Sequence, residues 1–233
     1  MIDTHCHLDL HDEPVNLVRR MNAADITCVA VTMLPSHYRL GVPHLAPFEK
    51  LHAALGLHPL RITEGAREIK DFIALSKTTS YIGEIGLDFS REGKSTKSLQ
   101  IKALSQILAS VKGGKFVTVH SRQAVPELLR MLGEAEVSPV CFHYFTGETA
   151  QAEKVVEAGH FFSLNSKMLE GKHRVLLDVI PRNRILVETD APYLTKDPIF
   201  AIEQTYAALA KGWGVPLSEA VDTLSENFAE CRT

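Results

Sequence analysis

The sequence has no long hydrophobic run, no cationic start leading into an apolar stretch, and no excess of positive charge. Without such segments, no membrane span or signal peptide is expected. The formal net charge is −3, so no general basic field is available to hold long nucleic acid non-specifically. A phosphate-bearing substrate would need a local site. These absences predict a soluble protein of the cytoplasm.

Cysteine is scarce and its spacing forms no pair. Cys6, Cys28, Cys141 and Cys231 lie far apart, and no C-x-x-C motif occurs. Three of the four lie in apolar, strand-like runs, where a free cysteine acts as a small hydrophobic side chain. A chain of 233 residues that is 45% hydrophobic can bury a substantial core without disulfides. The cysteine content therefore fits a reducing compartment.

Short β-branched, apolar runs alternate with longer amphipathic ones along the whole chain. Eight runs are typical of strands: the N-terminal run ending at His7, and residues 26–33, 53–57, 81–86, 116–120, 139–143, 160–164 and 184–190. Helices are expected from residue 14, at 66–77, 95–112, 124–134, 148–158 and 174–179, and in the tail from 199 to about 232. Three prolines and a glycine predict only short helices between residues 35 and 50. Eight strands alternating with helices predict an α/β fold, a single-domain (β/α)8 TIM barrel over residues 1–233.

The chain opens with Met-Ile-Asp-Thr-His-Cys-His-Leu-Asp. In a strand, successive side chains point to opposite faces, so His5 and His7 share one face and make half of a metal site. Taken alone this motif is weak, because two strand histidines are often only polar residues at a strand end. The hypothesis depends on whether further ligands reach the same place.

Four more side chains of the metal-binding type fall on other strands. Glu84 lies in the fourth strand, His120 ends the fifth, His143 ends the sixth and Asp190 ends the eighth. Functional groups of such barrels lie at the C-terminal ends of the strands. The sequence thus places His5, His7, Glu84, His120, His143 and Asp190 at one rim. Four imidazoles and two carboxylates are enough for two divalent ions, with Glu84 placed between them.

With these motifs the chain resembles the TatD family of metal-dependent hydrolases, within the amidohydrolase-like barrels. The matching stretches are DTHCHLD (3–9), GLHP (56–59), GEIGLDF (83–89), VHSR (119–122), FHYFTG (142–147) and ETDAPYL (188–194), with Asn227 near the end. The resemblance implies a divalent-metal-dependent deoxyribonuclease, often exonucleolytic from the 3′ end of single strands.

The resemblance also implies roles for single residues. One metal would be held by His5, His7, Glu84 and Asp190, and a second by Glu84, His120 and His143. Asp190 and Glu84 would be the catalytic carboxylates, Asp190 accepting a proton from a water that the metals convert to hydroxide. The ligands tolerate Zn²⁺, Mn²⁺ or Mg²⁺, and the many imidazoles favour Zn²⁺ or Mn²⁺.

Three loops depart from the family pattern. Leu60 replaces a second histidine after GLHP, the stretch at residues 90–93 is short, and residues 196–198 lead directly into the last helices. Loops after strands set substrate choice whereas ligands set the chemistry. In this compact form the chain resembles the TatD-type component of bacterial Qat anti-phage systems, which implies partners among the other components of such a system besides DNA.

Five residues near the ligands have two interpretations each. His58 and Arg122 could contact a substrate phosphate, or His58 could be a turn residue and Arg122 could pair with a buried carboxylate such as Glu188. Glu188, Asp9 and Asp88 could orient the ligands from behind, although loop capping also explains Asp9 and Asp88. Nearby aromatic residues could stack on bases, but such side chains more often only pack: Tyr144, Phe145 and Tyr193.

Two other functions remain compatible with the sequence. A metal-dependent amidohydrolase or esterase acting on a small or aminoacyl substrate would use the same ligands, and the shortened loops and acidic net charge fit it. A non-catalytic subunit of a defence complex would also show shortened loops. The complete ligand set favours an enzyme, and the nuclease ranks first.

Overall fold

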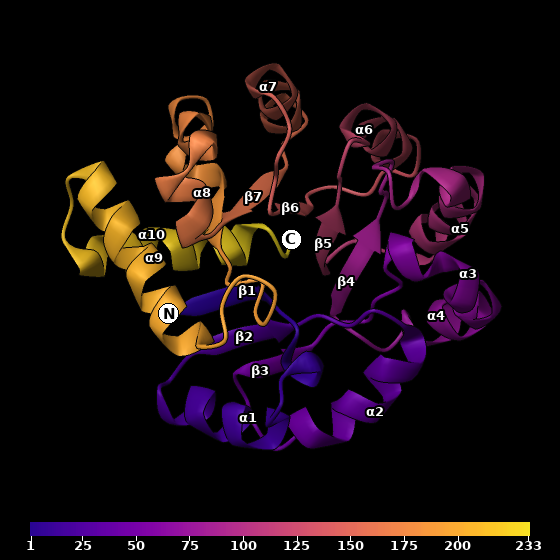
Figure 1. The fold of residues 1–233 in the computed structure, drawn as a ribbon, viewed down its shortest axis with the longest axis horizontal. Coiled ribbons are helices and arrows are strands. Elements are labelled where there is room, and N and C mark those ends of the chain that lie inside the picture. The colour runs from indigo at the N-terminus through magenta and orange to yellow at the C-terminus, as the bar shows by residue number, and fades with distance from the viewer.

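The structure is a computed structural model that describes residues 1–233, and eight parallel strands form its centre (Figure 1). Their bounds are β1 Ile2–Cys6, β2 Thr27–Ala30, β3 Leu51–Ala53, β4 Tyr81–Gly86, β5 Phe116–His120, β6 Cys141–His143, β7 Phe161–Leu164 and β8 Ile185–Val187. All eight expected strands are present, most of them shorter than the apolar runs that predicted them. The third begins two residues earlier than expected, and its run continues only as a single bridge at Leu55.

The strands close into a barrel through two joints. Pairing is continuous within β1–β3 and within β4–β8. Leu55 bridges to Ile82 and so joins the two sheets on one side. On the other side, the backbone N–H of Asp190 donates to the His5 carbonyl (2.9 Å) and that of His7 to the Ala191 carbonyl (2.8 Å). The (β/α)8 architecture is confirmed, and this second joint fixes two of the expected ligand segments against each other.

Helices surround the strands on the outside of the barrel (Figure 1). The α-helices are α1 Pro14–Ala23, α2 Pro35–Leu45, α3 Ile62–Gly65, α4 Ile69–Leu75, α5 Lys97–Ser110, α6 Val125–Glu134, α7 Thr149–Glu157, α8 Ser166–Glu170, α9 Pro198–Trp213 and α10 Leu217–Glu230. Short 3₁₀ turns are η1 Leu8–Leu10, η2 Pro59–Arg61, η3 Ala66–Glu68, η4 Lys94–Thr96, η5 Lys172–Asp178 and η6 Arg182–Arg184. None of the helices combines the length and apolar character that a membrane crossing requires.

Two helix predictions were wrong in detail. Residues 35–45 form one helix of 11 residues rather than short pieces, because Pro35 occupies its first turn, where a missing N–H costs nothing, and both of its ends are buried. Pro43 lies inside this helix, so packing outweighs the local penalty. Conversely, the helix expected at 66–77 is divided between η3 and α4.

Asn227 ties the last helix to the barrel. Its buried side-chain amide donates to the backbone carbonyls of Arg182 (2.8 Å) and Ile185 (2.7 Å). α10 is thereby fixed at the start of β8, at the opposite end of this strand from the rim where the ligands lie. Asn227, which resembles the family's C-terminal asparagine, thus holds α10 against the barrel.

We expect Asn227→Ala to lower the free energy of unfolding by about 2 kcal/mol, since two buried carbonyls lose their donor. Chemical denaturation measures the change. Asn22→Ala, at an exposed position in α1, is the matched control and should change stability by less than about 0.5 kcal/mol. Equal stability of both variants would show that the two hydrogen bonds contribute nothing net.

Candidate metal centre

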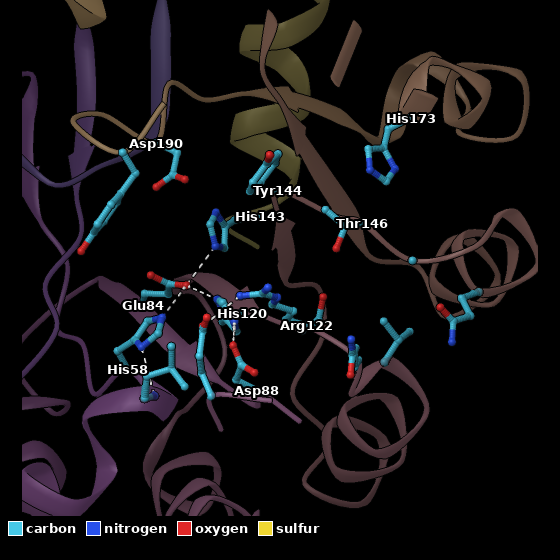
Figure 2. Close-up of a pocket in the computed structure, with 18 of the residues that line it drawn as sticks. His58, Glu84, Asp88, His120, Arg122, His143, Tyr144, Thr146, His173 and Asp190 are labelled. Carbon is cyan, nitrogen blue, oxygen red and sulfur yellow. Dashed lines mark hydrogen bonds and ion pairs between the residues drawn. The ribbon is translucent and has the colours of Figure 1, made fainter. Parts of the chain in front are cut away.

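The six expected ligands meet at the C-terminal rim of the barrel, around the carboxylate of Glu84. Figure 2 shows four of them: Glu84, His120, His143 and Asp190. They come from β1, β4, β5, β6 and the segment after β8. Except for His120, all are buried. The structure therefore brings together residues as far apart in the chain as His5 and Asp190.

One oxygen of Glu84 faces the histidines of β1. Glu84 Oε2 lies 3.4 Å from His5 Nε2 and 3.6 Å from His7 Nε2, and His7 Nε2 lies 3.7 Å from Asp190 Oδ1. Ligand atoms that surround an ion tetrahedrally at about 2.1 Å are about 3.4 Å apart. His5 Nε2 is buried without a hydrogen-bond partner, while its Nδ1 lies 3.0 Å from the Thr118 hydroxyl. This donor set fits a divalent ion.

The other oxygen of Glu84 faces the histidines of β5 and β6. Glu84 Oε1 lies 2.8 Å from His120 Nδ1 and 2.9 Å from His143 Nε2, which are hydrogen-bond distances. Glu84 thus presents one oxygen to each of two groups of nitrogen donors. That is the geometry expected of a carboxylate shared by two ions.

Two buried carboxylates, Asp88 and Glu188, each lie close to the ring nitrogen of one of these histidines that does not face Glu84. Asp88 Oδ2 lies 2.9 Å from His120 Nε2. Glu188 Oε2 lies 3.5 Å from His143 Nδ1, and its carboxylate accepts hydrogen bonds from the side chains of Ser163 and Asn165. Such outer partners fix the tautomer and the orientation of a ligating imidazole.

Asp9 does not reach a site histidine in this way. Its carboxylate pairs with His37 Nδ1 of α2 at 3.6 Å, and the residue is exposed. The role of Asp9 in orienting a ligand stays a prediction. The chain turns into η1 directly after His7, and this turn carries the Asp9 side chain toward α2.

Burial and neighbouring charges set the protonation of the site. Burial lowers the pKa of His5 to about 3, so this imidazole is neutral and has a lone pair to donate. Burial alone would raise the pKa of Glu84, but His58 and His143 hold it well below its usual range. Burial raises the pKa of Asp190 to about 7. The centre thus combines an ionised carboxylate with a second carboxyl group that can exchange a proton near neutral pH.

His58 lies on the same rim and is also a turn residue. Its Nδ1 accepts from the backbone N–H of Leu60 (3.1 Å) at the start of η2. The neutral ring therefore carries its proton on Nε2, which lies 3.4 Å from Glu84 Oε1. With Nδ1 committed in this way, His58 is suited to donate a hydrogen bond rather than to bind a metal.

Arg122 does not form the ion pair with Glu188 that the sequence analysis considered. Its guanidinium pairs with Glu92 at 3.1 Å, with both side chains at least half exposed, and not with Glu188. Exposed pairs of this kind contribute little to stability. Arg122 also lines the cleft above the centre, where it is free to exchange Glu92 for an anionic ligand.

Sequence reasoning missed several polar residues beneath the ligands. Buried Asp3 accepts hydrogen bonds from the backbone N–H (3.1 Å) and hydroxyl (2.6 Å) of Thr189, which join β1 to the chain after β8. Thr118 contacts His5, as described above. The signal was strand parity, because residues two apart share a face: Asp3 with His5, Thr118 with His120, and Ser163 with Asn165.

Five of the six ligands, all except His5, line a cleft of about 870 Å³. This volume falls within the range of small-molecule and cofactor sites. The cleft extends from Asp190 past Tyr144 to Thr146 and His173 (Figure 2). Tyr193, 57% exposed at the rim, sets its ring edge-on to His7.

Comparison with known proteins gives one family. The model of the family "TatD related DNase" matches residues 2–232. A Mycobacterium tuberculosis protein named as an uncharacterized metal-dependent hydrolase, TatD, is 32% identical over 85% of this chain and 82% of its own length. The human protein named deoxyribonuclease TATDN3 is 26% identical over 97% of this chain and 92% of its own length.

Solved structures share the fold. A TatD-family hydrolase from Entamoeba histolytica superposes with a TM-score of 0.85, at 18% identity, over 100% of this chain and 97% of its own. The TatD homologue YjjV from Escherichia coli gives a TM-score of 0.79, at 23% identity, over 97% and 95%. These likenesses extend over the whole barrel.

Proposed function

The chain belongs to the TatD-related DNase family and is a metal-dependent hydrolase, and we propose that it cleaves phosphodiester bonds of DNA, acting from the 3′ end of single strands. The observation that carries this proposal is Glu84, which offers one carboxylate oxygen to each of two donor groups. Centres with two ions about 4 Å apart are suited to in-line displacement at phosphorus.

In this proposal His5, His7, Glu84 and Asp190 hold one divalent ion, and Glu84, His120 and His143 hold the second. When bound, such ions lower the pKa of water toward neutrality and neutralise charge that develops on the phosphodiester. The imidazole-rich donor set favours Zn²⁺ or Mn²⁺ over Mg²⁺.

The protein's own groups supply positioning and proton transfer. The carboxylate of Asp190 lines the cleft and accepts the proton of the attacking water. His58 Nε2–H and the Arg122 guanidinium donate hydrogen bonds to the non-bridging phosphate oxygens.

Asp88→Asn tests the support of His120. An amide accepts a weaker hydrogen bond from His120 Nε2–H than a carboxylate does, so we expect metal affinity or kcat to fall by about 10- to 100-fold. Metal titration of the chelated protein, followed by rates at saturating metal, separates the two effects. Glu134→Gln, at an exposed position of α6, is the control. Unchanged metal affinity and rate would mean that Asp88 only caps the loop after β4, where it accepts the backbone N–H of Ser90, and does not support His120.

Nuclease activity itself is tested with end-labelled oligonucleotides, single- and double-stranded. Wild type and His120→Ala are chelated and then given Mg²⁺, Mn²⁺ or Zn²⁺. The proposal expects a metal-restored ladder that shortens from the 3′ end, fastest on single strands, and no ladder with the variant. A wild type that holds metal but leaves every oligonucleotide intact would contradict it.

A second candidate uses the same centre on an amide or ester of a small or aminoacyl substrate. It is favoured by the bounded cleft and by Leu60 and Met33, which add apolar surface beside His58. Hydrolysis of such an acyl substrate, without action on oligonucleotides, would establish it.

The compact loops also support a role in phage defence. The partners would then be the other components of an anti-phage system. Phage plating on cells that express the complete system measures this role. Loss of protection in Asp190→Asn is the expected result. Full protection in that variant, together with co-purifying partners, would instead show a non-catalytic subunit.

A further inference from the structure

The cleft has an arm that the metal centre does not use. It is formed by segments that follow β5, β6 and β7, and it lies on the side of Tyr144 away from Asp190 (Figure 2). We define the arm by its lining residues: Gln123, Thr146, Gly147, Gln151, Lys172 and His173.

One cation and one carboxylate, Lys172 and Glu148, border the arm. Lys172 makes no ion pair, whereas Arg122 at the entrance is paired with Glu92. Glu148 also borders the arm, but its carboxylate accepts the backbone N–H of Gln151 in the capping box of α7. Lys172 is therefore the cation of the arm that is available to pair with a phosphate.

Neutral donors accompany this charge. The Gln151 side-chain oxygen accepts from the backbone N–H of Glu148 at 3.2 Å, so both of its amide hydrogens remain to donate. His173 lies beside Lys172, and its half-buried ring keeps a pKa below the usual value through burial and that neighbouring charge. One ammonium with amide and imidazole N–H groups matches a phosphate.

The surroundings of Gly147 leave no room for a side chain. A Cβ at this position would lie 2.6 Å from the Gln151 side-chain oxygen and 2.6 Å from Cζ of Phe145. The Phe145 ring is fully buried in the core and cannot move aside. Any larger residue would therefore push into the cleft or displace the capping glutamine.

We propose that the arm binds the nucleotide next to the scissile bond, with the Lys172 ammonium paired to its non-reacting phosphate. This inference rests on the proposed nuclease function. A polynucleotide bound at the metals necessarily brings a second phosphate near the first, whereas a small acyl substrate brings none. The arm then determines preference for polynucleotide over simple phosphodiesters.

The test compares two substrates of the metal-loaded enzyme: a single-stranded oligonucleotide and bis(4-nitrophenyl) phosphate, which has only one phosphate. Lys172→Ala should lower the ratio of kcat/KM for the oligonucleotide to that for the simple diester by about fivefold. The loss should appear in KM, and the slope of log KM against log salt concentration should fall by about 0.7, the value for one phosphate contact on a single strand. Lys172→Arg should restore the salt slope.

Lys167→Ala is the matched control, because this lysine is exposed on the neighbouring α8 and does not line the cleft. An unchanged ratio and salt slope in Lys172→Ala, or an equal loss on both substrates, would overturn the inference while leaving the nuclease proposal intact. A wild type that hydrolyses the simple diester but no oligonucleotide would refute the nuclease proposal, and the inference with it.

Discussion

Asp190→Asn is expected to lower kcat by about a thousandfold with little change in fold, since a missing general base costs about 10²- to 10⁴-fold. Asp190 is 6% exposed and lines the cleft, and in the metal-free chain burial raises the pKa of its carboxyl group to about 7. An amide of the same shape cannot accept a proton. The backbone of Asp190 has φ of 48°, a left-handed conformation that asparagine tolerates better than alanine does.

Rates on a single-stranded oligonucleotide at saturating Mn²⁺ measure this loss, and thermal unfolding verifies the fold. Asp178→Asn, at an exposed position, is the control for removing one negative charge. A rate for Asp190→Asn within tenfold of wild type would exclude Asp190 as the proton acceptor.

Glu84→Gln is expected to remove bound metal and to lower activity by at least about 10³-fold, corresponding to about 4 kcal/mol of transition-state stabilisation. Glu84 is the one side chain within 3.6 Å of ring nitrogens from β1, β5 and β6. A neutral amide offers one oxygen and one NH₂ group in place of two anionic oxygens. The substitution would also remove the negative charge that His120 and His143 share.

Elemental analysis after gel filtration measures the metal content, with Glu226→Gln in α10 as a charge-matched control remote in sequence from the ligand segments. Metal content equal to wild type in Glu84→Gln, with activity retained, would show that this carboxylate does not join the two groups of donors.

Most of the barrel follows from local sequence pattern. Apolar runs such as residues 116–120 form strands because their β-branched side chains are buried on both faces. The gathering of His5, Glu84, His143 and Asp190 followed from one rule, that the C-terminal ends of parallel strands meet at one rim. The closure into a barrel was predicted from the alternation of eight strands with helices.

What the sequence did not reveal depends on contacts between distant segments. The helix at residues 35–45 persists despite Pro43 because its buried ends pack on the barrel. Asp9 turns toward His37, and Arg122 toward Glu92, because short turns after the strands redirect both side chains. Local propensity contains none of these pairings. Nor could spacing alone show that Thr118 and His5 meet across the barrel.

The most direct test of the two-ion centre is to load chelated wild type with Mn²⁺ and to measure stoichiometry and electron paramagnetic resonance together. The account predicts two ions per chain with the signature of a spin-coupled pair, as a shared Glu84 carboxylate requires, and one uncoupled ion in His120→Ala. A single ion in wild type, or two ions without coupling, would contradict it.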